Sequence, residues 1–267
     1  MSAWPVVPAP DARRRRLWPL IRRVWITAGL LATAIFVAWS LIAYRATDEG
    51  RAALRTDGSV TVGHVDGYWA FDPKAPSTTG LIFFAGALVD PIAYAPLAHA
   101  IAAAGFPVML VELPRRGAFG GADGPEVFAR ARAAAASRPG INRWIAAGHS
   151  RGGVVASQMV RDGFPGLAGA VLIGTSHPRD FSLASAAIPI TRVYGTRDTV
   201  ADVDKLERTR ANLPLSARIV AIDGGNHSQF GYYGFQPGDW PATITRDAQQ
   251  AITRRALLDA LRLAAAR

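Results

Sequence analysis

One short stretch of the chain has the pattern that makes a serine nucleophilic. Residues 148–152 read GHSRG, a G-x-S-x-G sequence centred on Ser150, and they follow an apolar run ending near Ala147. Small residues on both sides of the serine let a strand turn sharply into a helix and lift the hydroxyl clear of the sheet. The pattern alone occurs by chance, but the flanking strand and helix favour Ser150 as a nucleophile.

A nucleophilic serine needs a base, because its hydroxyl barely ionises at neutral pH, and the base needs an acid that orients it. In a strand–turn–helix architecture the expected chain order is serine, acid, histidine. Asp198 follows an apolar run at 190–194, and His227 follows another at 218–222. The sequence therefore predicts Ser150, Asp198 and His227 as catalytic residues, each placed just after a strand.

Each of these residues also has a structural interpretation. Ser150 could cap the helix that begins there, His227 could bond a backbone carbonyl in its loop, and Asp198 could cap a turn. Asp202 or Asp204 could be the acid instead, although their place at the start of the next helix favours an interaction with the helix dipole.

A serine nucleophile also needs backbone N–H groups that stabilise a tetrahedral oxyanion. One donor is expected to be the residue after the nucleophile, Arg151, and the other lies in the loop after the strand at 80–84. In that loop we expect Ala87 to be the donor, with Leu88 as the second candidate. Small apolar residues suit a loop that contributes its backbone.

The remaining histidines carry no metal pattern. His149 is interpreted as structural and pointing away from the nucleophile, whereas His177 is a candidate to line the pocket. His64 and His99 have no ligand spacing, and the chain has no cysteine. No metal and no cofactor are expected.

Ser150, Asp198 and His227 can act together only if secondary-structure elements bring them to the same end of a sheet. Strands are predicted at 59–64, 68–71, 80–84, 108–111, 144–147, 170–173, 190–194 and 218–222, and helices at 94–105, 125–136, 154–160, 203–213 and 246–265. Alternating strands and helices indicate an α/β fold with a mostly parallel sheet, whose sites lie at the carboxyl ends of the strands. The 15 or so residues before 190 are too few for a large cap domain.

Four stretches resemble a known family. They are FFAGALVDPIAYAPLA (83–98), GHSRGG (148–153), YGTRD (194–198) and GGNHSQFGYYGFQPGD (224–239). The chain resembles the α/β-hydrolases of the dienelactone-hydrolase-like group, in the branch called alpha/beta hydrolase fold-5. The resemblance covers about 59–265 and implies a Ser–His–Asp triad at Ser150, His227 and Asp198. Arg151 and Trp240 depart from the family pattern, as does Ala85.

The N-terminal part predicts a membrane anchor. Residues 24–44 contain no charge and are long enough, at about 1.5 Å per residue, to cross a bilayer. Six arginines at 13–16, 22 and 23 precede them, which favours a cytoplasmic N-terminus and a catalytic domain outside the cytoplasm. A cleaved signal peptide and a buried core helix are the alternatives.

The chain is therefore expected to have four parts. They are a basic cytoplasmic segment (1–23), a transmembrane signal anchor (24–44), a linker (45–58) and a hydrolase domain (59–267). Half of the net charge of +10 lies in the first segment and the rest is spread along the chain, and no basic face or recognition motif favours nucleic acid.

The expected protein is a membrane-anchored serine hydrolase of carboxylic esters or thioesters, working through an acyl-enzyme on a small-molecule ester. An acyltransferase with a non-water acceptor and a non-catalytic binding protein are the alternatives.

Overall fold

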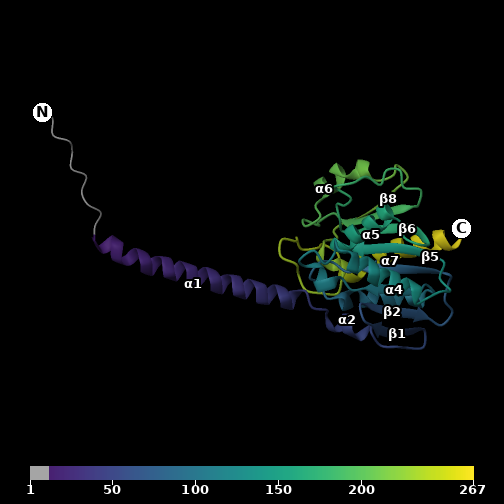
Figure 1. Cartoon of the computed structure of the whole chain (residues 1–267), viewed down its shortest axis with the longest axis horizontal. Helices are drawn as coiled ribbons and strands as arrows, with labels where there is room; N and C mark the ends of the chain where they lie inside the picture. The colour runs from purple at the N-terminus through teal and green to yellow at the C-terminus, as the bar shows by residue number, and fades with distance from the viewer. Residues whose placement is uncertain (1–11) are drawn as a thin grey trace. The chain divides into compact units, whose positions relative to one another are not determined.

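The computed structural model describes residues 12–267, and the chain divides between Ile42 and Ala43 into two compact units. The second unit is built on one eight-stranded sheet with the order β1-β2-β4-β3-β5-β6-β7-β8 (Figure 1). The strands are β1 (Val60–Val65), β2 (Tyr68–Pro73), β3 (Thr79–Phe84), β4 (Val108–Val111), β5 (Arg143–His149), β6 (Leu167–Ile173), β7 (Ile190–Gly195) and β8 (Arg218–Ile222). Strands β3 to β8 run parallel, and only the pairs β1–β2 and β2–β4 are antiparallel. The expected mostly parallel α/β fold is confirmed.

Helices cover both faces of this sheet. The α-helices of the unit are α2 (Asp48–Ala52), α3 (Ala95–Ala103), α4 (Pro125–Ala136), α5 (Arg151–Asp162), α6 (Val203–Arg208) and α7 (Arg246–Ala265). Short 3₁₀ turns are η1 (Pro91–Tyr94), η2 (Pro114–Gly117), η3 (Arg210–Asn212) and η4 (Ser228–Phe230). Helices α3 and α7 share one apolar core with one face of the sheet, and α4 and α5 share another core with the opposite face.

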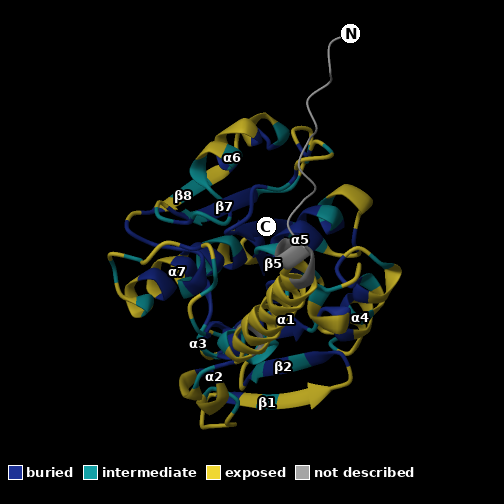
Figure 2. Ribbon diagram, turned by 90° about the vertical axis from the view of Figure 1, so that its left-hand side faces the viewer, coloured by how far each residue is buried: buried dark blue, intermediate teal, exposed yellow. Residues whose placement is uncertain are grey.

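The burial of the strands follows their sequences. Strands β3 (TGLIFF) and β4 (VMLV) are buried along their whole length, as expected where helices cover both faces. The edge strand β1 is mostly exposed, as Figure 2 shows. Only Val60 is fully buried in it. The carboxyl ends of the six parallel strands lie on the same side of the sheet. The loops that carry the polar side chains of the candidate site follow these ends.

The connection between β6 and β7, residues 174–189, contains no helix and no strand. A cap domain inserted at this point of the chain is therefore absent, as its length predicts.

Residues 45–58, expected as a linker, are part of the folded domain. Ala46 and Gly50 are buried, and Thr47 caps helix α2. A Cβ at Gly50 would lie 3.1 Å from the carbonyl oxygen of Ile92, so the glycine lets α2 pack closely on η1. The sequence did not predict this helix, because most of its residues are charged and only its smallest residues face the core.

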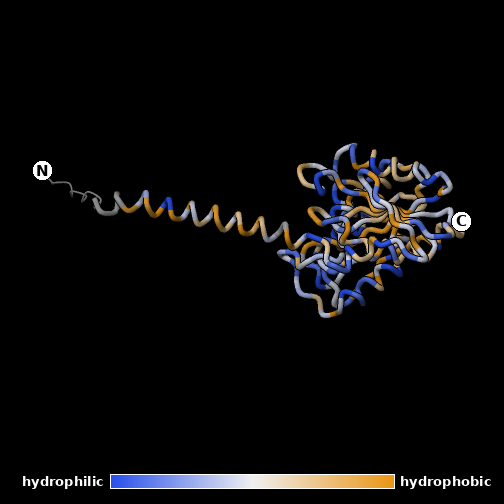
Figure 3. Tube along the Cα trace, turned by 90° about the horizontal axis from the view of Figure 1, so that it is seen from below, coloured by the Kyte–Doolittle hydropathy of each residue, from blue (hydrophilic) through white to orange (hydrophobic). Residues whose placement is uncertain are grey.

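The first unit contains helix α1 (Ala12–Ala43). Its stretch Leu17–Trp39 is long and apolar enough to cross a membrane, and no part of that stretch is buried (Figures 2 and 3). Tyr44, expected at the end of the span, belongs to the second unit, where its carbonyl accepts from the N–H of Asp90 at 2.9 Å.

Candidate active site

Ser150 lies on a sharp turn between β5 and α5. Its φ is 53° and its ψ is −116°, a conformation that costs a non-glycine residue on the order of 1–3 kcal/mol. A Cβ at Gly148 would come within 2.2 Å of the carbonyl carbon of Gly152, and one at Gly152 within 2.1 Å of the Phe84 oxygen. Only glycine fits at these two positions, so the G-x-S-x-G pattern is a steric requirement of this turn.

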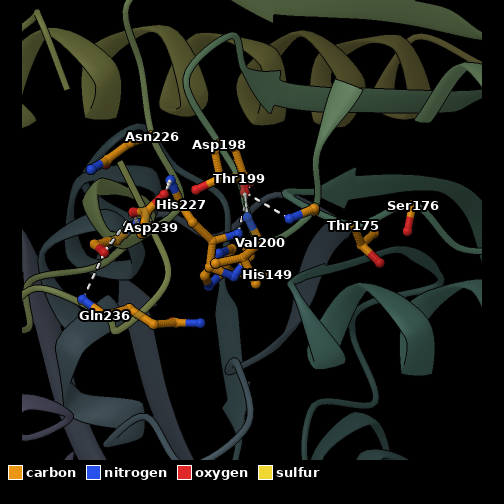
Figure 4. Close-up of polar contacts among 12 residues, drawn as sticks. His149, Thr175, Ser176, Asp198, Thr199, Val200, Asn226, His227, Gln236 and Asp239 are labelled. Carbon is orange, nitrogen blue, oxygen red and sulfur yellow. Dashed lines mark hydrogen bonds and ion pairs between the residues drawn. The ribbon is translucent and has the colours of Figure 1, made fainter. Parts of the chain in front are cut away.

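His227 and Asp198 meet at the ends of β8 and β7 (Figure 4). The distance between His227 Nδ1 and Asp198 Oδ2 is 2.7 Å, and both side chains are buried. The other carboxylate oxygen, Oδ1, accepts from the N–H groups of Val200 at 2.9 Å and Ala201 at 2.7 Å. Since a carboxylate accepts, Nδ1 donates, and His227 Nε2 is left with the lone pair of a base.

Ser150 and His227 line the same cavity of about 240 Å³. Among the described residues, His227 Nε2 has no hydrogen-bond partner, so the serine and the histidine are not bonded to each other here. Catalytic hydrogen bonds are often long in the absence of substrate and tighten when it binds. The arrangement brings a serine and a histidine to one cavity, and the histidine is already paired with the buried Asp198.

The alternative acids have other contacts. Asp202 caps α6, and its Oδ1 accepts from the N–H groups of Asp204 at 2.9 Å and Lys205 at 3.3 Å. The hydrogen bond from the backbone of Lys205 is the main cause that lowers the pKa of Asp202. Asp204 lies in the first turn of the same helix. Of the three aspartates, Asp198 is the one in contact with His227.

The two candidate oxyanion donors in the loop after β3, Ala87 and Leu88, differ in their hydrogen bonds. The N–H of Leu88 donates to the carbonyl of Arg116 at 2.7 Å, so it is already engaged. The N–H of Ala87 makes no hydrogen bond within residues 12–267, and Ala87 lines the cavity with Ser150. Arg151 opens helix α5, where N–H groups lack a partner inside the helix. The side chain of Arg151 forms an ion pair with Asp123.

His149, interpreted from the sequence as structural, is fully buried and packs against the candidate base. The centroids of the His149 and His227 rings are 4.4 Å apart. Tyr94 accepts from the N–H of Gly86 at 3.1 Å, and its hydroxyl lies 2.7 Å from His149 Nδ1. Burial, followed by the proximity of His227, holds the pKa of His149 well below its usual value, so this ring is neutral. The contact between the two rings is a finding of the structure.

The sequence analysis missed Asp239, which holds the loop of His227. Its Oδ1 accepts from the N–H of His227 at 3.2 Å, and its Oδ2 accepts from the N–H and the hydroxyl of Ser228 at 2.8 and 2.7 Å. Asp239 is only 5% exposed. Asp239 is the last residue of the stretch GGNHSQFGYYGFQPGD, and its place in that stretch could have marked it as a candidate.

His177 lines the cavity, as the sequence suggested. Its carbonyl accepts from Arg192 at 2.9 Å, and burial lowers the pKa of its own ring. Arg192 is buried and forms no ion pair with any described residue, and burial lowers its pKa to about 10.

Within the described chain, no group of three or more His, Asp or Glu side chains could hold a metal ion.

The fold and this site define a hydrolase of the α/β type. Residues 80–251 match the alpha/beta hydrolase family, and the chain belongs to that family. No curated protein sequence matches the chain.

Solved structures are similar in fold at low sequence identity. A thermophilic esterase from the Planctomycetes species Thermogutta terrifontis has 16% identity and a TM-score of 0.51, over 76% of this chain and 90% of the esterase. An alpha-beta serine hydrolase homologue from Coxiella burnetii has 14% identity and a TM-score of 0.52, over 78% and 99%. The esterase domain of a Rhodothermus marinus protein has 12% identity and a TM-score of 0.52, over 73% and 92%.

Proposed function

We propose that the protein is a membrane-anchored serine hydrolase that cleaves carboxylic esters or thioesters through an acyl-enzyme. The observation that carries the proposal is the pairing of buried Asp198 with His227 on a cavity that also holds the strained Ser150. The esterases among the similar structures support an ester substrate.

In this mechanism Ser150 attacks the carbonyl carbon while His227 Nε2 accepts its proton, and the N–H groups of Ala87 and Arg151 stabilise the oxyanion. His227 returns the proton to the leaving group, which departs as an alcohol or thiol. A water molecule then attacks the acyl-enzyme with the same base, and the acid is released. Asp198 keeps Nδ1 protonated and stabilises the imidazolium that forms in both steps.

The test is hydrolysis of a butyrate ester by the full chain in detergent. Ser150→Ala is expected to lower kcat/KM by at least about 10³-fold, because it removes the nucleophile. Ser176→Ala is the matched control, since Ser176 lines the same cavity and its hydroxyl bonds Arg179 at 2.8 Å. Equal activity in wild type and Ser150→Ala would reject the mechanism.

We also propose that helix α1 spans the membrane with its N-terminus in the cytoplasm. The arginines at 13–16, 22 and 23 support this orientation, because basic flanks stay on the cytoplasmic side. A green fluorescent protein fused after Arg267 is expected to be exported and therefore to stay dark. Bright cytoplasmic fluorescence would contradict the proposed orientation.

A further inference from the structure

Four large apolar side chains are exposed on the loops that surround the candidate site. They are Leu88, Phe119, Phe235 and Trp240, and we call them the apolar rim. Phe119 is 93% exposed and Trp240 is 58% exposed. Such side chains mark a contact surface when they gather at one end of a domain.

The rim residues lie at one edge of the sheet. Leu88 follows β3, Phe119 follows β4, and Phe235 and Trp240 follow β8. Because these strands are parallel, the loops after them extend from the same edge, the one that carries Ser150 and His227.

Direct contacts tie the rim loops to the site. The N–H of Leu88 bonds the carbonyl of Arg116, three residues before Phe119. The carbonyl of Trp240 accepts from the side chain of Asn226, the neighbour of His227, at 2.7 Å. The loops of Leu88 and Phe119 are therefore bonded to each other, and the loop of Trp240 is bonded to the loop that carries His227.

The chain enters the domain at this same edge. Gly234 donates to the carbonyl of Ala43 at 2.7 Å, and Asp90 donates to the carbonyl of Tyr44 at 2.9 Å. Both donors belong to rim loops, since Gly234 precedes Phe235 and Asp90 lies two residues after Leu88.

The distance along the chain from the apolar span to this edge is short. The span ends at Trp39 and the domain begins at Ala43, with helix between them, so four residues cover about 6 Å. The apolar span and the domain are therefore joined by a short segment of chain.

The charges beside the rim suit a phospholipid surface. Arg115 and Arg116, four and three residues before Phe119, are exposed and form no ion pair with any described residue. Arg197 lies 5.7 Å from the ring of Trp240. Aromatic rings with adjacent arginines are typical of groups at the depth of lipid headgroups, where anionic lipids attract the cations.

We infer that the apolar rim docks on the bilayer, so that the cavity opens toward the membrane and takes esters carried by the lipid phase. This inference rests on the proposed function, because it takes α1 as the span and Ser150 as the nucleophile. The partner is a lipid surface, and the substrate class is an ester whose carbonyl lies at the headgroup level.

The absence of cysteine from the chain allows a direct test with the full protein in phosphatidylcholine–phosphatidylglycerol vesicles. Phe119→Cys and Trp240→Cys are labelled with a polarity-sensitive fluorophore, and Leu215→Cys is the matched control. Leu215 is fully exposed and precedes β8, at the opposite edge of the sheet. The labels at 119 and 240 are expected to be quenched by brominated lipids and shielded from iodide, and the label at 215 to behave oppositely.

A kinetic comparison of two esters tests the proposed substrate class. Phe119→Ser/Phe235→Ser is expected to lower turnover of a vesicle-borne ester about tenfold and to leave a water-soluble ester unchanged. Labels at 119 and 240 as accessible to iodide as the label at 215 would overturn docking, even if soluble esters are hydrolysed. Recovery of the chain in the supernatant after the vesicles are pelleted would overturn it as well. Lipid-quenched labels in a chain that hydrolyses no ester would support docking and reject the proposed function alone.

Discussion

Replacing Asp198 by asparagine tests the role of the buried acid without changing its shape. Oδ1 of Asp198 accepts from the N–H groups of Val200 and Ala201, so the amide oxygen of the variant must stay at that position. The amide NH₂ then occupies the position of Oδ2, 2.7 Å from His227 Nδ1, where two donors would face each other. The imidazole escapes this repulsion by moving its proton to Nε2, which removes the lone pair that should accept the serine proton.

The expected loss is about 10⁴-fold in kcat, or about 5.4 kcal/mol of transition-state stabilisation, as for the same change in a well-studied triad. Steady-state kinetics with a butyrate ester measure it. Asp202→Asn is the control and is expected to stay within about tenfold, because a charge at a helix end contributes only about 0.3–1 kcal/mol. Near-wild-type turnover in Asp198→Asn, together with a collapse in Asp202→Asn, would refute the assignment of the acid.

Three further variants test the surroundings of the site. Asp239→Asn is expected to lower kcat roughly 10-fold or more with little change in KM, since it loosens the loop of the base through lost hydrogen bonds worth about 1 kcal/mol or more each. Gly152→Ala is expected to cost at least about 1–3 kcal/mol in thermal stability through its clash with backbone, whereas Gly140→Ala, with open space around it, is neutral. Because buried His149 stays neutral while the unfolded chain takes up a proton below about pH 6.5, wild-type stability should fall by up to about 1.4 kcal/mol per pH unit below that pH. His149→Gln should lose this component, as melting temperatures from pH 7.5 to 5 would show, and identical pH dependence in the two proteins would contradict it.

The parts of the fold that the sequence predicted are those with strong local signals. The apolar run of β3 and the G-x-S-x-G turn after β5 depend on nearest neighbours, so their patterns carry the information. Helix α2 escaped prediction because Gly50 and Ala46 bury little apolar surface and their partner, η1, is about 45 residues away.

The site shows the same limit. The sequence placed Ser150, Asp198 and His227 after three strands, and the structure shows the contact between Asp198 and His227. It could not separate Ala87 from Leu88, because that choice depends on a hydrogen bond to Arg116 in another loop. Contacts made across loops, such as Asp239 to the His227 backbone, leave no periodic pattern in the chain.

The nucleophilic role of Ser150 is tested most directly by the covalent reaction of the full chain with a fluorophosphonate, followed by mass spectrometry of its peptides. A nucleophilic serine displaces fluoride and keeps the phosphonyl group on its oxygen. One adduct is expected, on Ser150, and it should be absent in Ser150→Ala and unchanged in Ser176→Ala. No adduct on the folded wild-type protein, or an adduct that persists in Ser150→Ala, would contradict it.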